Sequence, residues 1–407
     1  MTCKGCFANQ ATILLDLGLQ PVSNDLLLST AELETEPTYP LIVEVCDICS
    51  FVQILPVSSK ENLFKHDYVY FSSFSESWLK HSENFARRMT SYLSLSQKDL
   101  VLEIASNDGY LLKYFKDLNV SVLGVEPAAS VANAAIEIGI ETRIDFFGNN
   151  LAQTLLLEGV APSLIIANNV LAHVPDIHDF LFGISHLLRE DAIATFEFPH
   201  VMRLLMHNQF DTIYHEHYSY LSVTALKPIF EKVGLKIFSV EEIDTHGGSL
   251  RIFSALEQST YSIDKSVQEV VLAESVFDPR KEQVRSTFLS AVSKVRRELT
   301  SELIDLRDRG FSVVGYGAAA KGNTLLNYCS IDSSLINSVG DLNPTKQWKF
   351  LPGSGIPIVP PDNLFEQEID VIFVLPWNLS NEIKDQLKEK VPQGTKFLRA
   401  IPNLEYF

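Results

Sequence analysis

The sequence lacks the features that would place the protein in a membrane or on a nucleic acid. No apolar stretch approaches the length of about 18 residues that a membrane-spanning helix requires. The N-terminal segment MTCKGCFANQ has neither the basic start nor the apolar centre of a signal peptide. Lysine and arginine number 33 against 51 aspartate and glutamate, a net charge of -18, which gives no basic surface for a phosphate backbone or an anionic membrane. We therefore expect a cytoplasmic protein that binds neither nucleic acid nor membrane, although a few local cations suffice for a small anionic ligand.

Cysteine is also scarce, with five in 407 residues, and four of them stand in two C-x-x-C pairs. The pairs are CKGC, with Cys3 and Cys6, and CDIC, with Cys46 and Cys49. In a reducing cytoplasm such pairs favour one tetrahedral zinc site over redox-active or unrelated cysteines. Four thiolates fill the coordination sphere, so we predict a structural zinc ion with no open position for catalysis. We interpret the remaining Cys329 as a small buried apolar residue.

Three segments with different patterns divide the chain. Residues 1–65, with the strand-like runs YPLIVEVC and FVQILPV beside the second cysteine pair, predict a β-rich zinc-binding domain. Residues 66–255 alternate apolar strand-like runs with helical stretches, which predicts an α/β domain with a mainly parallel sheet covered on both faces. Residues 256–407 repeat this alternation after a long helix and predict a second, Rossmann-like domain. Ligands of such sheets bind at the carboxyl ends of the strands.

The long helix carries apolar residues at spacings of three and four, which is the period of one helical face. These residues are Val284, Phe288, Val292, Val295, Leu299, Leu303 and Leu306. We interpret the stripe as a packing face between domains and not as a partner site.

A cofactor loop is expected after the first strand of the middle segment, in VLEIASNDGY. The acidic Glu103 at the strand end, followed by small or turn-tolerant residues, resembles the first motif of class I S-adenosylmethionine methyltransferases. Ala105 and Asn107 occupy two positions where that motif usually has glycine, and Gly109 is retained. Asparagine tolerates left-handed dihedral angles and alanine has a minimal side chain, so the backbone can still approach a ligand closely. We assign these four residues and Asp108 to the cofactor site.

Two further stretches bear on the cofactor. LGVEP places Glu126 and Pro127 at the end of the next strand, where a carboxylate can accept both ribose hydroxyls of a nucleoside, as it also does in NAD enzymes. The stretch ANNVLAHVPD, which contains Asn168, resembles the segment after the fourth strand of small-molecule methyltransferases. The Asn/Asp-Pro-Pro-aromatic run of polymer-directed N-methyltransferases is absent from it. These features favour S-adenosylmethionine.

Motifs along the whole chain then resemble one family. In order they are the two cysteine pairs, LDLGLQPVSNDLL, DYVYFSSFSESWLKH, EIASNDGYLL, FDTIYHEHYSYLS, HGGSLRIF and GYGAAAKGNTLLNY. Together they resemble the sugar-nucleotide C-3 methyltransferases of deoxysugar pathways, with Ala105 as a departure from the expected glycine. The resemblance implies an α/β fold in which a class I methyltransferase Rossmann-like domain is flanked by an N-terminal zinc-binding domain and a C-terminal Rossmann-like domain that binds the sugar nucleotide.

The resemblance also implies the chemistry of the run IYHEHYSYLS. These enzymes methylate carbon 3 of a 4-keto-deoxysugar on a nucleoside diphosphate, here expected to be that of thymidine, so a proton must leave a carbon beside a carbonyl group. By similarity His217 is the base, with Glu216 in its network and Tyr214 as a donor to the sugar. Further catalytic candidates are Tyr68, or its neighbour Tyr70, and His173. The residues expected to line the substrate side are Tyr70, His246, Gly247, Arg251, Tyr316, Gly317, Ala318, Lys321 and Asn323.

Four neighbouring side chains are left outside the site. His200 and His215 are interpreted as satisfied edge or core residues, and Tyr218 and Tyr220 as packing residues.

The C-terminal loop GYGAAAKG leaves an alternative open. Gly315, Gly317 and Ala320 satisfy G-x-G-x-x-A, and Asp341 follows at about the distance of the dinucleotide fingerprint. Taken from the residues alone, this loop could bind NAD in an oxidoreductase acting on a sugar nucleotide. The resemblance favours the diphosphate of the sugar nucleotide at the same helix N-terminus, with Lys321 adding charge. A non-catalytic zinc-bearing scaffold is the second alternative, and the sequence does not determine the oligomeric state.

Overall fold

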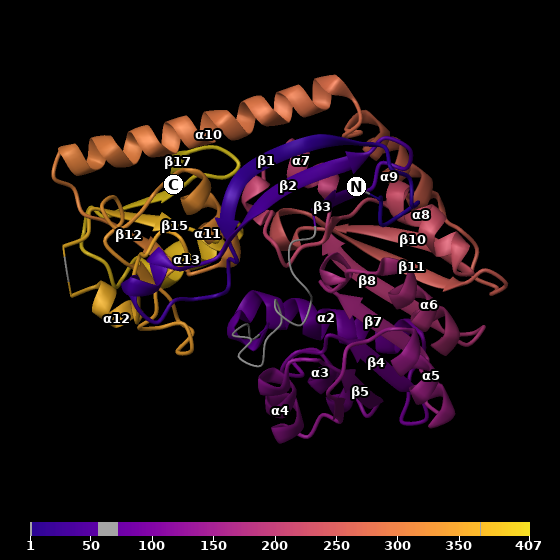
Figure 1. Ribbon diagram of the computed structural model, residues 1–407. Coiled ribbons are helices and arrows are strands. Elements are labelled where there is room, and N and C mark those ends of the chain that lie inside the picture. The colour runs from indigo at the N-terminus through magenta and orange to yellow at the C-terminus, as the bar shows by residue number, and fades with distance from the viewer. Residues whose placement is uncertain (1, 56–71, 367) are drawn as a thin grey trace.

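The computed structural model describes residues 2–55, 72–366 and 368–407, which form three sheets (Figure 1). The N-terminal part and the C-terminal part lie side by side under the long helix α10 (Glu282–Asp308). The middle part lies lower in this view, on the side of the N-terminal end of α10. Among the described residues no helix is both long enough and apolar enough to span a bilayer.

The N-terminal sheet has four antiparallel strands in the order β1-β2-β3-β9. Their bounds are β1 (Ala11–Pro21), β2 (Thr38–Cys46), β3 (Val52–Ile54) and β9 (Ser219–Tyr220). The fourth strand therefore comes from a distant part of the chain. Leu14 and Val43 share one buried cluster with Leu299 of α10 and Leu326 of the C-terminal part. The small N-terminal unit thus completes its core against the C-terminal domain.

The middle sheet has seven strands in the order β10-β11-β8-β7-β4-β5-β6. Six run in the same direction, and β11, between β8 and β10, runs antiparallel to both of its neighbours. The strands are β4 (Leu100–Ile104), β5 (Ser121–Val125), β6 (Thr142–Arg143), β7 (Leu164–Asn168), β8 (Ile193–Pro199), β10 (Leu235–Ile243) and β11 (Ser249–Leu256). The accompanying helices are α2 (Glu76–Tyr92), α3 (Leu112–Asp117), α4 (Ala129–Glu137), α5 (Asn149–Leu157), α6 (Ile177–Leu187), α7 (Val201–Met206), α8 (Val223–Lys232) and α9 (Lys265–Val276).

Both faces of the middle sheet are buried, as predicted. On β4 the side chains of Leu102 and Ile104 join one apolar cluster, and that of the preceding Val101 joins another. Since successive strand residues point to opposite faces, two separate clusters mean that each face has its own covering layer.

The C-terminal sheet has six strands in the order β14-β13-β12-β15-β16-β17, all parallel except β17. They are β12 (Val313–Tyr316), β13 (Val339–Gly340), β14 (Ile358–Val359), β15 (Val371–Val374), β16 (Lys396–Arg399) and β17 (Glu405–Tyr406). Its helices are α11 (Ala320–Tyr328), α12 (Pro361–Leu364) and α13 (Ser380–Leu387). The first strand, β12, lies in the centre of the sheet, and the later strands are added on both sides of it. This is the Rossmann-like order that the sequence predicted.

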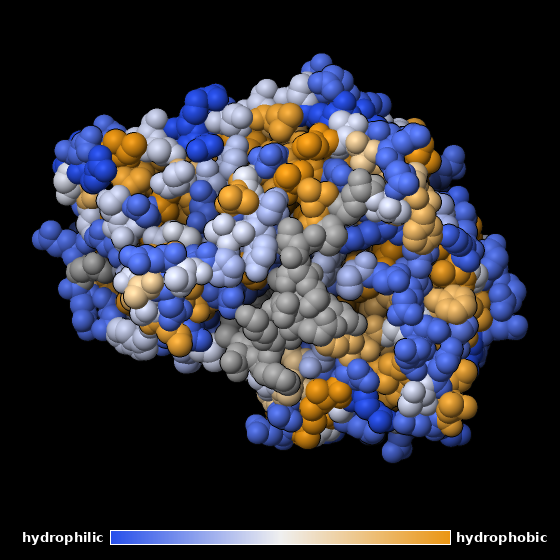
Figure 2. Space-filling model, viewed as in Figure 1, coloured by the Kyte–Doolittle hydropathy of each residue, from blue (hydrophilic) through white to orange (hydrophobic). Residues whose placement is uncertain are grey.

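The apolar stripe of α10 is a packing face, as predicted. Six of its seven residues are buried, and Val284 packs against the same cluster while partly exposed. The exposed face of the molecule is mixed: hydrophilic residues predominate, while apolar residues gather over the N-terminal strands below α10 (Figure 2). There Ile13 and Leu19 of β1 are 59% and 67% exposed.

Candidate active site

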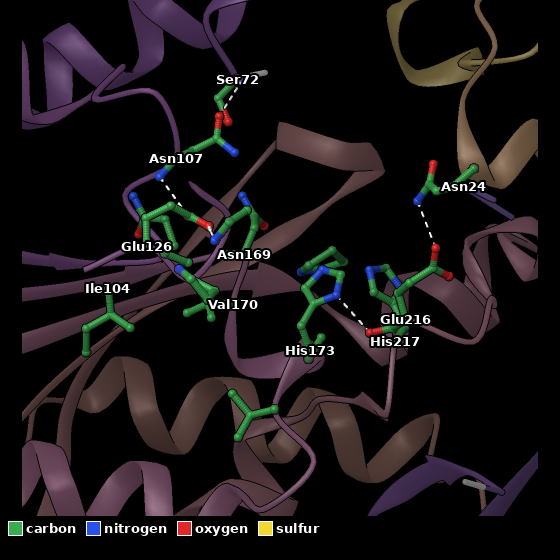
Figure 3. Close-up of a pocket in the computed structure, with 18 of the residues that line it drawn as sticks. Asn24, Ser72, Ile104, Asn107, Glu126, Asn169, Val170, His173, Glu216 and His217 are labelled. Atoms are coloured by element: carbon green, nitrogen blue, oxygen red, sulfur yellow. Dashed lines mark hydrogen bonds between the residues drawn. The ribbon is translucent and has the colours of Figure 1, made fainter. Parts of the chain in front are cut away.

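One cavity of about 360 Å³ lies where the three parts of the chain meet. It is bordered by the carboxyl ends of β4, β5 and β7, by the segment 212–217 and by the N-terminus of α11. Figure 3 shows this arrangement, with His173 between the β4–β5 end of the cavity and the Glu216–His217 end. Of the predicted site residues, those that line it are Ala105, Asn107, Glu126, Pro127, Asn168, His173, Tyr214, Glu216, His217, His246 and Lys321.

The four paired cysteines lie together, away from this cavity. Their sulfur atoms are all within 4.8 Å of one another, and the Sγ–Sγ distances of Cys3–Cys49 and Cys6–Cys46 are both 3.5 Å. Four sulfurs at about 2.3 Å from one tetrahedral zinc ion would be separated by about 3.8 Å. The donor set and its spacing therefore fit a closed zinc site. Cys329 is buried elsewhere, in the core beside α10.

The loop after β4 adopts the backbone expected of a glycine-type cofactor loop. Its three alternate residues Ala105, Asn107 and Gly109 have φ angles of 56°, 50° and 76°. These left-handed angles stand at the positions where the motif usually has glycine. Beneath the loop Glu103 is completely buried, and burial raises the pKa of its carboxyl group well above the ordinary value, against the opposing effect of the Tyr110 hydroxyl.

Glu126 ties the loop to the next strand. Its Oε2 accepts from the backbone N–H of Asn107 at 3.0 Å and its Oε1 from that of Ala128 at 2.9 Å. Burial raises the pKa of Glu126 to about 7, although these two hydrogen bonds act in the opposite direction. Asn168, at the end of β7, is buried at the cavity wall, and its Oδ1 has no hydrogen-bond partner among the described residues. The Glu126 carboxylate and the Asn168 amide oxygen can thus accept hydrogen bonds from donor groups of a ligand.

His217 is held as a neutral base. Its Nδ1 lies 2.9 Å from the carbonyl oxygen of Thr212, which can only accept, so Nδ1 carries the proton. Nε2 then holds the lone pair and accepts from the Tyr214 hydroxyl at 2.8 Å. Burial, and next the charge of nearby His173, lower the pKa of His217 well below its usual value. The ring is therefore uncharged at neutral pH.

His173 and Glu216 complete this end of the cavity. The His173 Nδ1–H donates to the Glu216 backbone carbonyl at 2.8 Å, and the His173 and His217 ring centroids are 4.6 Å apart. Burial lowers the pKa of His173 to about 4 and raises that of the Glu216 carboxyl group to about 7. His246, whose pKa burial lowers to about 4, also lines the cavity, beside Trp78. Three neutral imidazoles and a carboxyl group near neutrality suit proton transfer at a carbon atom.

The C-terminal domain contributes positive charge. The Lys321 ammonium donates to Asn378 Oδ1 at 2.7 Å and lies 4.7 Å from the centre of the Trp377 ring. The Lys346 ammonium is buried and donates to the Ala318 carbonyl at 2.8 Å. Both line the cavity next to the N-terminus of α11, and neither has a carboxylate within salt-bridge distance among the described residues. Lys346 is buried and Lys321 partly buried, and their hydrogen-bond partners are neutral, while the Asp211 carboxylate interacts with Lys321 at longer range. An anionic ligand would complete the neutralisation of these two cations.

Several predicted residues lie elsewhere. Tyr68 and Tyr70 fall outside the described residues. Arg251 does not reach the cavity: it lies opposite Glu197 in the β11–β8 register, and its guanidinium contacts that buried carboxylate at 2.6 Å. The other predicted residues that do not line the cavity are Glu103, Asp108, Gly109, Gly247, Tyr316, Gly317, Ala318 and Asn323. Gly317 and Gly247 have structural uses, since a Cβ atom would come within 2.6 Å of Pro376 and 2.4 Å of Trp377.

The four neighbours left out of the site are all buried. His200 pairs with buried Glu274 at 2.8 Å, and His215 donates from Nε2 to the Pro40 carbonyl at 3.4 Å. Tyr218 and Tyr220 are 2% and 6% exposed.

Comparison with known proteins identifies the family of this chain. Residues 3–64 match the family model of a zinc binding domain, residues 78–240 that of a methyltransferase domain, and residues 244–402 that of a C-methyltransferase C-terminal domain. Over 400 residues the chain is 32% identical to the C-methyltransferase NovU of Streptomyces niveus, covering 98% of this chain and 95% of the relative. The chain belongs to the C-methyltransferase family. It is an S-adenosylmethionine-dependent enzyme with a four-cysteine zinc site, as the sequence predicted.

Solved structures match less than half of this C-methyltransferase. The PH0226 protein of Pyrococcus horikoshii is 14% identical with a TM-score of 0.38, over 46% of this chain and 95% of that one. Magnesium protoporphyrin IX methyltransferase of Synechocystis is 13% identical with a TM-score of 0.33, over 44% of this chain and 81% of that one.

The cavity of this C-methyltransferase also has walls that the sequence did not reveal. They include Asn24, Trp78, Tyr110, Phe146, Phe147, Asn169, Lys346 and the stretch 319–320. Trp78 lies in the quoted motif DYVYFSSFSESWLKH, so a role could have been suspected from its position. Asn24 likewise lies in the quoted motif LDLGLQPVSNDLL. Nothing in the sequence pattern distinguishes Lys346 from an ordinary surface residue, because long-range packing brings it to the site.

Proposed function

We propose that this C-methyltransferase transfers a methyl group from S-adenosylmethionine to carbon 3 of a nucleoside diphosphate 4-keto-deoxysugar, with a thymidine nucleotide as the first candidate. The observation that carries the proposal is the neutral His217, whose Nε2 bears the lone pair and which shares one cavity with the cofactor loop and with the two lysines Lys321 and Lys346. A base, a methyl-donor site and an anion site in this arrangement match an acidic carbon on a phosphate-bearing substrate.

The first step is deprotonation. Nε2 of His217 takes the proton from carbon 3, and the electron pair of that bond moves into the enolate of the 4-keto group. Because Nε2 has a single lone pair, which accepts the Tyr214 hydroxyl in this structure, that hydroxyl must first turn from Nε2 toward the 4-keto oxygen. There it donates to the oxygen on which negative charge develops, and the Nε2 lone pair is open to the carbon 3 proton.

The second step is carbon–carbon bond formation. S-adenosylmethionine supplies an electrophilic methyl group whose bond to sulfur breaks as carbon 3 attacks it. The role of this chain is positioning. Glu126 and Asn168 would hold the adenosine end, while the N-terminus of α11, Lys321 and Lys346 would hold the diphosphate.

The decisive experiment follows the carbon 3 proton. His217→Asn should bind both ligands yet lose methyl transfer and the exchange of that proton with heavy water, each by about 10²–10⁴-fold. Tyr214→Phe should be milder, by at most about 10²–10³-fold, because it removes one donor to the enolate. Solvent exchange followed by NMR measures both. Rapid exchange in His217→Asn would mean that another group, such as Glu216 or His173, removes the proton.

The substrate class needs its own test. Labelled S-adenosylmethionine is incubated with a panel of 4-keto-deoxysugars on thymidine and other nucleoside diphosphates. Incorporation of label at carbon 3 is expected for at least one of them. No incorporation from any member of the panel, by protein that binds the cofactor, would overturn the sugar-nucleotide assignment.

A further inference from the structure

The N-terminal unit holds the loop that carries His217 from several sides. Asn24 donates its Nδ2–H to Glu216 Oε1 at 2.9 Å (Figure 3). The backbone N–H of Ile54 donates to the Tyr218 carbonyl at 3.2 Å, and β3 pairs with β9 immediately after the loop. The loop belongs to the methyltransferase domain in sequence, but its geometry depends on the zinc-bearing unit.

Asn24 differs from these backbone contacts because it also lines the cavity. Its partner Glu216 is only 1% exposed and lines the same cavity. With Oε1 occupied by the Asn24 amide, Oε2 is the acceptor that remains, and it has no hydrogen-bond partner among the described residues. A buried carboxylate oxygen without a donor in a ligand cavity is suited to a hydroxyl group of that ligand.

We propose that Asn24 is a positioning residue of the active site, which fixes the Glu216 carboxylate so that its free oxygen accepts a hydrogen bond from a hydroxyl group of the sugar. This inference rests on the proposed function, since it needs a hydroxylated substrate. Losing the Asn24 amide would let the carboxylate rotate and would remove a donor that favours its ionised form.

The charge state of Glu216 gives a direct readout. Burial raises its pKa to about 7, the Asn24 side chain opposes this, and the charge of Asp25 from the N-terminal unit adds to it. From the loop side, the hydroxyl of Tyr220 is electrostatically coupled to the same carboxylate. Removing the amide donor should therefore raise the pKa of Glu216, so that its ionised form is lost at a higher pH than in the wild type.

The experiment is a double-mutant cycle of Asn24→Ala and Glu216→Gln in the full zinc-loaded chain. Asn24→Ala should lower kcat/KM for the sugar nucleotide about tenfold and move the acid limb of its pH profile to higher pH. Asn24→Asp, which adds a like charge, should move the limb further, and Asn24→Ser should restore part of the loss. In the Glu216→Gln background Asn24→Ala should change little. Independent, multiplying effects of the two substitutions, or an unmoved limb, would overturn the proposal.

Two controls separate this outcome from others. Asn9→Ala removes an exposed asparagine of the same unit, whose side chain accepts from the Thr2 hydroxyl at 2.8 Å, so it should leave the profile unchanged. If Asn24→Ala does not fold, Asn24→Ser carries the test. Carboxyl ¹³C NMR follows the Glu216 titration without any substrate. The proposed function fails if the wild type turns over no sugar nucleotide, whereas the Asn24 proposal fails if the Glu216 titration is the same in wild type and variant.

Discussion

The two Rossmann-like sheets of this protein use the same local device on opposite sides of one cavity. In each, a strand runs into a loop with left-handed backbone, and an acidic residue after the neighbouring strand accepts a backbone N–H from that loop. Glu126 accepts from Asn107 at 3.0 Å in the middle domain, and Asp341 accepts from Ala318 at 2.7 Å in the C-terminal domain. Both loops therefore have the form of a nucleotide-binding turn, and the fingerprint alone does not tell them apart.

The charges around the two loops differ. The walls beside the middle loop carry Glu126 and neutral side chains, whereas Lys321 and Lys346 are the lysine or arginine residues among the described lining and both stand at the C-terminal loop. A sulfonium cofactor with an adenosine suits the first environment, and a diphosphate suits the second. The charge of the side chains beside such a loop therefore predicts its ligand better than the glycine pattern does. The match to a C-methyltransferase over 98% of this chain, and not the charge, argues against an NAD-dependent oxidoreductase.

The largest expected effect tests the cationic side. Lys321→Met should weaken binding of thymidine diphosphate by about 2–5 kcal/mol, because the phosphates lose a charged hydrogen-bond partner inside the cavity. Affinity for S-adenosylmethionine should stay unchanged. Calorimetry with each ligand measures both. Lys346→Met should act in the same direction, and Lys265→Met, whose side chain is 87% exposed on α9, serves as the neutral control. Loss of cofactor affinity with retained diphosphate binding would reverse the roles of the two loops.

The next effect tests the acidic side. Glu126→Ala should weaken S-adenosylmethionine binding by about 1–3 kcal/mol, the range for a lost hydrogen bond to a charged group. Diphosphate affinity should not change. Equilibrium dialysis with labelled cofactor gives the first value. An unchanged cofactor affinity would place the ribose away from β5.

The pH dependence of cofactor binding is a smaller effect from the same carboxylate. Because burial raises the pKa of Glu126 to about 7 and ribose hydroxyls donate to its ionised form, binding should be full above pH 7. Affinity should fall as the pH drops below 7, by at most about tenfold per pH unit, since each bound cofactor must then displace a proton. Titrations between pH 5.5 and pH 8.5, about 1.5 units on either side of that pKa, measure the slope. Glu126→Gln should bind more weakly and with a flat profile.

Much of this architecture could be predicted from the spacing of residues in the sequence. The zinc cysteines, the packing stripe of α10 and the loop of Ala105, Asn107 and Gly109 follow from neighbouring residues, because tetrahedral ligation, helical period and left-handed backbone are local properties. The three-domain α/β fold followed from the alternation of apolar runs. The grouping of His173, Tyr214, Glu216 and His217 was expected from resemblance to a family and not from spacing.

Long-range pairing accounts for what the sequence did not reveal. Arg251 was expected at the substrate, yet the register of β11 against β8 sets it opposite Glu197, which takes up its charge. Asn24 and Lys346 were missed because their neighbours in sequence say nothing of their partners. The N-terminal sheet brings Asn24 to Glu216, and a turn after β13 returns Lys346 to the Ala318 carbonyl.

A smaller effect compares the two loops through their backbones. Gly317 in the C-terminal loop has a φ angle of 84°, and a Cβ atom there would lie 2.6 Å from Pro376. Gly317→Ala should therefore destabilise the protein by about 1–3 kcal/mol, through left-handed strain and overpacking. Chemical denaturation measures the change. A loss of stability below the error of that method would mean that the segment around Pro376 shifts to accommodate the added methyl group at no measurable cost in free energy.

The smallest expected effect is the reciprocal change in the middle loop. Ala105 has a φ angle of 56°, where a Cβ atom costs about 1–2 kcal/mol and glycine has no such strain. Glycine also gains entropy in the unfolded chain, which offsets about 0.4–1 kcal/mol of that relief. Ala105→Gly should therefore stabilise the protein by up to about 1.6 kcal/mol, measured by the same denaturation as Gly317→Ala. Opposite signs for the two substitutions would show that both loops have the same left-handed backbone and that only one of them has a glycine to fit it. Destabilisation by Ala105→Gly would instead mean that the alanine methyl group packs favourably enough to outweigh its strain.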